Sequence, residues 1–192
     1  MTALESLTRL VQPPTKPEAA PLDYDWETLE EAGKLADSYK QFVRTYGAGI
    51  LCDGIHILSP SAKTTYNIHI ATDGFRGVNL SLTRTGAAIS ELVQNDQLFP
   101  VKKLGAFVVA DSESGHTVLY LRTDDPRREN VVFYDHHAEV DGVTTQFNLS
   151  VVEFFEGVCS GKIKAAGFSE LFLKRGFRPM KTSWIELPGS ED

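Results

Sequence analysis

The feature that most constrains the fold of this chain is a helical run that ends in two glycines. The expected inward face of that helix carries four side chains at steps of three, one and three residues: Tyr39, Phe42, Val43 and Tyr46. Residues at these steps share one face of an α-helix. Gly47 and Gly49 predict the end of the helix, because glycine reaches left-handed backbone angles without a Cβ clash. The apolar run 50–58, with a turn or bulge at Gly54, is then expected to form the first strand segment.

The composition is that of one globular domain. The chain has 192 residues, of which 42% are apolar and 23% charged, and a chain of this length commonly folds as one domain. We expect an N-terminal arm and proline-rich linker over residues 1–22, a single domain over 23–185 and a tail over 186–192. No signal peptide is recognisable, and no stretch approaches the roughly 20 apolar residues that span a membrane. The sequence therefore predicts a cytoplasmic protein without a membrane partner.

The charge of the chain argues against nucleic acid as a partner. The formal net charge is −7 and the pI is near 5.2, whereas phosphate binding requires clustered lysines and arginines. The charges are also segregated along the chain. Ten acids and five bases lie between residues 91 and 147, and six bases and one acid lie between 161 and 185. This acidic balance is compatible with a basic protein partner, or with a solvated surface that binds nothing.

Periodicity and turn residues predict an α+β fold. Helices are expected over 2–11, from about Trp26, over 36–46, over about 78–95 and over 151–160, the last capped by Ser150 and ended by Gly161. A short strand or irregular segment is expected at 66–70, and four β-prone runs lie at 104–110, 117–122, 131–135 and 143–147. Their close spacing favours an antiparallel meander, because a parallel crossover needs a dozen or more residues. The predicted architecture is a mostly antiparallel mixed sheet of about five to six strands, packed by N-terminal, middle and C-terminal helices.

No group of residues predicts catalysis. The spacing of the five histidines does not bring together the three or four ligands of a metal site. Surface or structural roles are expected for them, and a metal site is the alternative. The run Asp111–His116 contains serine, histidine and acid side chains, but it lacks the glycine elbow of a serine nucleophile, so a hairpin loop is the better interpretation. Cys52 and Cys159 have no metal spacing and are expected to be buried, reduced thiols. The sequence predicts a non-enzymatic protein with no catalytic residue, no metal and no cofactor.

The order of several motifs resembles the SUKH superfamily of small α+β proteins. In the first half they are a leucine-bearing arm ending in prolines, Trp26 in an acidic context, Tyr39-Lys40-x-x-Val43-x-x-Tyr46-Gly47-x-Gly49, a strand ending at Pro60 and a helix around Asn79-Leu80. In the second half they are Leu98-Phe99-Pro100, a strand pair around 115–121, Val131-Val132-Phe133-Tyr134-Asp135 and Ser150-x-x-Glu153-Phe154-Phe155. The resemblance covers roughly residues 1–179. It departs from the family at Leu35-Ala36, where a Leu-Pro pair is common, and in lacking two tryptophans near the later strands.

The resemblance implies an immunity role. Bacterial members of the family are antidotes that bind and occlude a cognate polymorphic or contact-delivered toxin domain, often a nuclease or deaminase. The expected partner is therefore a cognate toxin protein. This chain is expected to bind it as a monomer or a weak homodimer. The alternative is a regulatory scaffold or ligand-sensing protein of the same fold, which would dock a protein partner through the basic segment 162–181. Members of that kind include cell-wall-synthesis regulators.

Two groups of residues follow from this interpretation. The structural family motif comprises Trp26, Tyr39, Phe42, Tyr46, Gly47 and Gly49, whose aromatic rings are expected in the core. The candidate toxin-binding residues are acids in or beside predicted turns of the second half: Asp111, Glu113, Asp124, Asp125, Asp135, Glu139 and Asp141. If these carboxylates gather on one face, they would steer a basic toxin and pair with its arginines. Calcium ligation by the aspartates is the competing interpretation, but no EF-hand spacing supports it.

Overall fold

The computed structural model describes nine stretches of the chain: 1–20, 37–62, 91–94, 97–100, 106–112, 115–121, 130–135, 143–163 and 176–180. Its helices are α1 (Ala3–Leu10), α2 (Asp37–Tyr46) and α4 (Val151–Ser160). The first strands are β1 (Gly49–Leu51), β2 (Ile55–Ile57), β3 (Glu91–Gln94) and β4 (Gln97–Pro100). The later strands are β5 (Ala106–Ser112), β6 (His116–Leu121), β7 (Asn130–Asp135), β8 (Val143–Phe147) and β9 (Phe177–Pro179).

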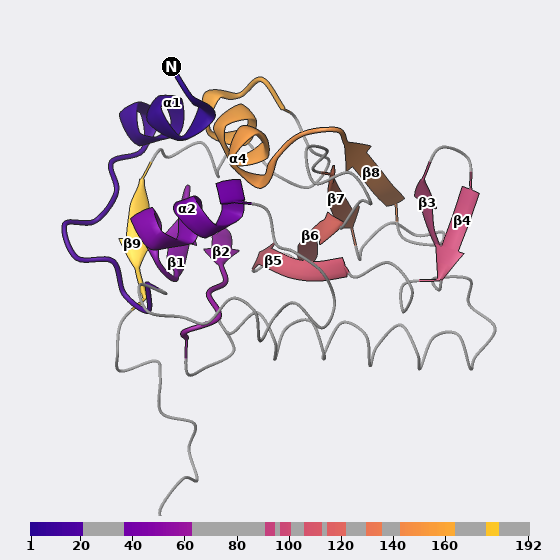
Figure 1. Ribbon diagram of the computed structural model, residues 1–192, viewed down its shortest axis with the longest axis horizontal. Coiled ribbons are helices and arrows are strands. Elements are labelled where there is room, and N and C mark those ends of the chain that lie inside the picture. Colours follow the sequence, from indigo (N-terminus) through magenta and orange to yellow (C-terminus); the bar gives the residue numbers. More distant parts are fainter. Residues whose placement is uncertain are drawn as a thin grey trace, which may run out of the picture.

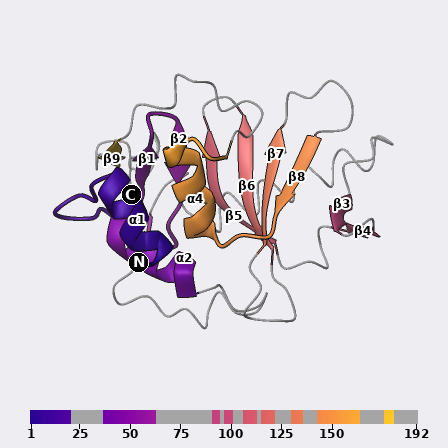
Figure 2. The ribbon, with the colours of Figure 1, turned by 90° about the horizontal axis from the view of Figure 1, so that it is seen from above.

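Seven of the strands form one antiparallel sheet, so the α+β class and the antiparallel meander are confirmed. The strand order is β8-β7-β6-β5-β2-β1-β9, and every ladder between these neighbours is antiparallel. The strands β5 to β8 follow one another directly, as the four β-prone runs predicted. The hairpin of β3 and β4 forms a separate pair beyond β8, at the far end from β9 (Figures 1 and 2).

The three helices within the described stretches lie on one face of the seven-stranded sheet (Figures 1 and 2). Directly paired residues of antiparallel strands point to the same face, so Phe177, Leu51 and Ile55 share one. Phe177 contacts the ring of Tyr46 in α2, with 5.1 Å between ring centroids. At the opposite edge of the sheet, the ring of Phe147 in β8 contacts the ring of Phe154 in α4, with 5.2 Å between ring centroids. The core therefore lies between this sheet face and the helices.

The glycine corner after α2 is required by two close approaches of the backbone. Gly47 has φ +71°, and a Cβ at this position would overlap the carbonyl oxygen of Glu18, whose segment bridges to it. Gly49 has ordinary backbone angles, but a Cβ there would lie 2.5 Å from the carbonyl oxygen of Arg178 on β9. The corner thus ends the helix, as predicted, and also admits the N-terminal arm on one side and a strand on the other.

The aromatic residues of α2 are core residues, as the periodicity predicted. Tyr39, Phe42 and Tyr46 are all fully buried. The Tyr39 hydroxyl donates to the carbonyl of Leu58 at 3.0 Å, and the Tyr46 hydroxyl donates to that of Val11 at 2.6 Å. These bonds satisfy polar atoms that would otherwise be costly to bury. Trp26, the remaining member of the structural motif, lies outside the described residues.

Helix α4 begins and ends where the sequence predicted. The Ser150 hydroxyl accepts the backbone N–H of Glu153 at 3.1 Å, and the Glu153 carboxylate accepts that of Ser150 at 2.8 Å, which is a capping box. Gly161 adopts φ +79° and ends the helix. The same reciprocal pair, Thr2 and Glu5, begins α1. Local capping therefore fixes the start of both helices.

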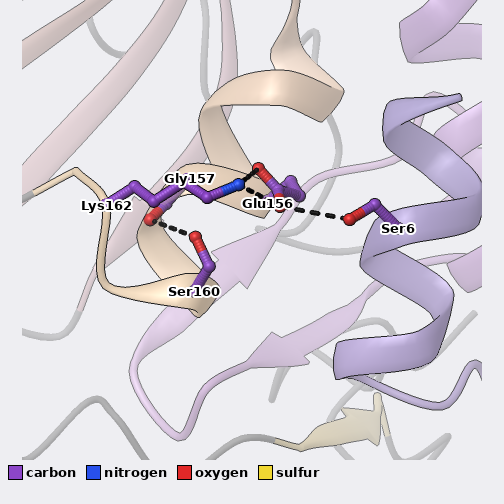
Figure 3. Close-up of polar contacts among 5 residues, drawn as sticks. All are labelled: Ser6, Glu156, Gly157, Ser160 and Lys162. Atoms are coloured by element: carbon purple, nitrogen blue, oxygen red, sulfur yellow. Dashed lines mark hydrogen bonds and ion pairs between the residues drawn. The ribbon is translucent and has the colours of Figure 1, made fainter.

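The N-terminal arm packs on the body through helix α1. Leu7 and Val11 belong to the same core cluster as α2 and α4. The Glu156 carboxylate of α4 joins three segments, because it accepts from Ser6 Oγ at 3.1 Å and from Lys162 Nζ at 2.9 Å (Figure 3). Figure 3 shows Glu156 lying between the two helices, with Lys162 reaching back over the end of α4. The domain boundaries near residues 22 and 185 stay predictions.

Two segments differ from the sequence-based expectations. The helix predicted over 78–95 is wrong where it can be compared, because Glu91–Gln94 is a strand paired to Gln97–Pro100. Residues 63–90, including the segment 66–70, lie outside the described residues. The C-terminal strand β9 was not predicted, and it raises the main sheet to seven strands. The predicted turn near Gly54 exists, but its left-handed residues are Cys52 and Asp53, at φ 52° and 60°.

Candidate functional site

The acids of the predicted site that the structure describes lie at strand ends of the β5–β8 meander. Only two of its seven acids fall within the described residues, Asp111 near the end of β5 and Asp135 at the end of β7. The other five lie outside them: Glu113, Asp124, Asp125, Glu139 and Asp141. The strand ends on either side of these five positions are described, so the sheet register gives the frame in which the site is set.

Hydrogen bonds of the Ser112 side chain join β5 and β6 beside Asp111. The Ser112 hydroxyl accepts the backbone N–H of His116 at 3.1 Å and lies 3.0 Å from the Nδ1 of the same histidine. Gly115 adopts φ +79° and donates its N–H to the Ser112 carbonyl at 3.0 Å. The His116 ring stacks on Phe133 with centroids 5.3 Å apart. Ser112 and His116 thus hold the hairpin closed, which agrees with the predicted hairpin loop.

Asp111 is engaged by a neighbouring strand. Its Oδ1 lies 3.0 Å from the Nδ1 of His56, the residue directly opposite on β2. The side chains of His56 and Asp111 are 20% and 39% exposed, so the pair lies at the border of the solvent. Because the acid pairs with His56 and His116 pairs with Ser112, these four residues do not assemble into a serine, histidine and acid relay.

The register separates the two described acids. Asp111 pairs across the sheet with Thr117, whereas Asp135 pairs with His116. The two acids therefore belong to neighbouring cross-strand rows and do not share one. Both rows lie at the same end of the sheet, where β5 and β7 end and β6 and β8 begin.

The predicted acids are divided between two ends of the sheet by the chain order. Asp124 and Asp125 fall between Leu121 and Asn130, which pair with each other at the opposite end from Asp111. Glu139 and Asp141 fall between Asp135 and Val143, which pair at the same end as Asp111. The chain order thus assigns Asp111, Glu113, Asp135, Glu139 and Asp141 to one end of the sheet. Successive positions along a strand alternate between the two faces, so the register does not place Asp111 and Asp135 on the same face.

The described residues hold no candidate metal centre. Among them, no group of three or more histidine, cysteine, aspartate or glutamate side chains converges as metal ligands would. His69, His136 and His137 lie outside the described stretches. The expectation of no metal and no cofactor stays a prediction.

Sequence patterns did not predict the proximity of the two cysteines. Cys52 and Cys159 are both buried, as expected, and are not joined in a disulfide. Their Sγ atoms nevertheless lie 3.0 Å apart. A separation of 107 residues in the chain leaves no local signal from which this contact could be read.

The basic segment that the alternative function requires is described only at its ends. Lys162 is 71% exposed in its side chain and pairs with Glu156, and Arg178 is exposed on β9. Residues 164–175 and 181 lie outside the described stretches.

None of the helices in the described stretches combines the length and apolar character needed to cross a membrane.

Comparisons with known proteins give no further guide to the site. No family model, no curated protein and no solved structure matches the chain.

Proposed function

We propose that this protein is a non-enzymatic immunity protein of the SUKH type, which binds and neutralises a cognate toxin domain by occluding the toxin active site. The toxin classes expected for such a partner are nucleases and deaminases. The observation that carries the proposal is the order of motifs along the chain. No single motif is specific, and their succession supports the proposal more than any one of them.

The described motifs fall on elements that pack together. The Tyr39–Gly49 motif forms α2 and its corner, and 131–135 forms β7. The Ser150–Phe155 motif forms the capped start of α4. Phe42 of the first motif stacks on Phe155 of the third at 5.1 Å. Residues that carry the resemblance therefore contact one another in the core, which supports a shared fold more than a chance series of short matches would.

Acidic groups at one end of the sheet support the choice of partner surface. A set of carboxylates on strand ends and turns attracts a basic toxin surface and accelerates association. Carboxylates also accept paired hydrogen bonds from arginines, which nucleic-acid-cleaving toxins need for phosphate binding. We assign this role to the acids of that end: Asp111, Glu113, Asp135, Glu139 and Asp141. Asp124 and Asp125 belong to the other end of the sheet and would contact the partner separately.

The first experiment tests whether a toxin partner exists. The gene beside the one for this chain is expressed with it, and the two purified products are mixed and run by size-exclusion chromatography with light scattering. We expect a stable complex and loss of the toxin activity at equimolar protein. Failure of the chain to bind or neutralise a toxin-like neighbour would reject the proposal.

The second experiment locates the contact surface with charge-matched variants. Glu139→Gln with Asp141→Asn removes two negative charges at the proposed surface. Glu5→Gln with Asp37→Asn removes two exposed charges on α1 and α2, and glutamine keeps the capping interaction with Thr2. The first variant is expected to slow association about tenfold at low salt, and the second is expected to leave it unchanged. Equal effects of the two pairs would remove these acids from the site.

The regulatory alternative has its own signature in the same experiments. A scaffold would bind a housekeeping protein through the basic segment, in which Lys162 and Arg178 are exposed. Its complex would then weaken on loss of positive charge in 162–181 and respond little to the acid variants. This result would favour the alternative over the immunity function.

A further inference from the structure

Two cysteines from distant parts of the chain meet in the core. Cys52 lies in the turn between β1 and β2, and Cys159 lies in the last turn of α4. Their sulfur atoms are 3.0 Å apart, and the residues are 1% and 2% exposed. An approach of about 1 Å would bring them to the S–S bond length of about 2.05 Å.

Cys52, one partner of this contact, has an unusual backbone conformation. Its φ is +52°, a left-handed angle that residues with a Cβ adopt at a cost in energy. Its N–H donates to the carbonyl of Gly176 at 2.8 Å, beside β9. Asparagine, aspartate and glycine are the residues that fit such an angle best. Cysteine in this position therefore points to a role for the thiol that the turn alone does not explain.

The surroundings of the pair are compact. The neighbouring Tyr46 hydroxyl donates to Val11, and burial, with a further contribution from Cys159 and Cys52, raises the pKa of Tyr46 above its ordinary value. A tyrosine that stays protonated leaves the thiols beside a neutral group. The β1–β2 turn and α4 contribute the two sulfur atoms, in the same core cluster as Tyr46 of α2.

We propose that Cys52 and Cys159 are a reversible redox pair, which forms an intramolecular disulfide between the β1–β2 turn and helix α4. The oxidant is a small-molecule disulfide such as oxidised glutathione. One protein thiolate attacks a sulfur of the oxidant, which forms a mixed disulfide and expels a small thiolate. The second protein thiolate then attacks the mixed disulfide, which forms the Cys52–Cys159 bond and expels the second small thiolate.

The exchange is balanced within the protein and its oxidant. The two protein thiols lose two electrons and two protons, and the small disulfide becomes two thiols. Because both sulfurs are buried, access requires local opening of the β1–β2 turn or the last turn of α4. The bond would close a loop of 107 residues, and a long loop restricts the unfolded chain strongly.

The test uses the full chain, purified reduced and kept folded below its unfolding transition. It is equilibrated with oxidised glutathione, denatured in an alkylating agent and analysed by intact mass and peptide mapping. We expect two cysteines protected from alkylation, a mass lower by two hydrogen atoms, and a linked peptide pair containing Cys52 and Cys159. Dithiothreitol should restore both thiols. Two alkylated cysteines, a persistent glutathione adduct or a disulfide-linked dimer would overturn the proposal.

A second measurement reads the same bond through stability. The oxidised chain is expected to melt about 5–10 °C higher than the reduced chain, from the usual contribution of a disulfide across a long loop. Cys159→Ala is the control, and its melting temperature should be the same with and without the oxidant. An equal rise in this control would show that the oxidant acts elsewhere and would contradict the assignment.

Discussion

The glycine corner after α2 and the acidic end of the β5–β8 meander are held together in opposite ways. At the corner, Gly47 and Gly49 leave no space for a Cβ, and the neighbouring aromatic side chains of α2 are fully buried. At the acidic end, the Asp111 side chain is 39% exposed and makes one short contact, to His56. Burial and close backbone contacts constrain the first region, whereas the second presents charge to solvent.

The difference separates stability from recognition. A buried corner tolerates few side chains, because displaced backbone or lost packing costs several kcal/mol. A half-exposed carboxylate contributes little to folding and can be exchanged at small cost. The corner is therefore where substitutions should unfold the protein, and the acidic end is where they should alter a partner.

The largest effect is expected at the corner itself. Gly47→Ala would place a Cβ against the carbonyl oxygen of Glu18 and would also strain a backbone with φ +71°. We expect a loss of about 3–5 kcal/mol in the free energy of unfolding, because the N-terminal arm must move away. Urea unfolding followed by circular dichroism measures it.

Gly161→Ala is the matched control for the clash. Gly161 has a similar φ of +79°, but an added Cβ would meet no atom within 4 Å. Only the backbone strain remains, so we expect a loss of about 1 kcal/mol. If the two alanine variants lose the same amount, the close approach of Glu18 is not what the corner requires.

A smaller effect is expected from the hydroxyl that ties α2 to the N-terminal arm. Tyr46→Phe removes the donor to the Val11 carbonyl, 2.6 Å away in the core, and leaves the ring packing in place. We expect a loss of about 1–2 kcal/mol at neutral pH, the usual cost of an unpaired buried acceptor. An unchanged urea midpoint would contradict the role of this bond.

Tyr46→Phe also tests the burial of the phenol through the pH dependence of stability at alkaline pH. Burial raises the pKa of Tyr46 in the folded protein above its value in the unfolded chain, which is near 10. Folding therefore favours the protonated phenol. Its contribution to the free energy of unfolding is fully present below about pH 10 and is lost as the pH rises toward the pKa of the folded state. Between about pH 9 and 11, wild-type stability should fall more steeply than that of Tyr46→Phe. Parallel pH profiles would argue against burial of the phenol.

An effect of similar or smaller size is expected at the start of α4. Ser150→Ala removes the hydroxyl that accepts from Glu153, and we expect a loss of about 1 kcal/mol. Thr2→Ala makes the same change at α1, which buries Leu7 where α4 buries seven residues, so its effect on global unfolding should be smaller. Thermal unfolding of both variants measures the difference. A larger loss at Thr2 would reverse this ranking.

The smallest effect on stability is expected at the acidic end. Asp111→Asn keeps the shape of the side chain and a hydrogen bond to His56, and it lies near the solvent. We expect a change within about 0.5 kcal/mol, measured by urea unfolding. A loss comparable to that of Tyr46→Phe would assign Asp111 to the structural region and remove it from the recognition surface.

Local signals were sufficient to predict much of this fold. The α2 face, the capping of α4 and the β5–β8 meander each depend on residues close together in the chain, such as Ser150 with Glu153. Strand β9 pairs with Gly49–Leu51, which is far away in the sequence. Its three residues, which end in Pro179, are too few to show the alternation of apolar and polar side chains that predicts a strand. Apolar spacing misled the prediction at Glu91–Gln94, where Leu92 and Val93 fit a helix or a strand equally.

The candidate site was less accessible to prediction from sequence. Acids beside turns were chosen by composition, and composition does not say which turns meet. The register now groups Asp111 with Asp135 at one end of the sheet and places Leu121 and Asn130, which flank Asp124 and Asp125, at the other. The contact of Cys52 with Cys159 arises only from tertiary packing. Partner recognition depends on a surface that another protein selects, so the sequence of one chain leaves it as a proposal.

The dissociation constant of the complex with the neighbouring toxin domain tests the central claim most directly. It is measured by calorimetry for the wild type, for Glu139→Gln with Asp141→Asn and for the control pair Glu5→Gln with Asp37→Asn. We expect a complex whose dissociation constant rises about tenfold or more with Glu139→Gln and Asp141→Asn and is unchanged by the control pair. The absence of a complex, or equal weakening by both pairs, would contradict this claim.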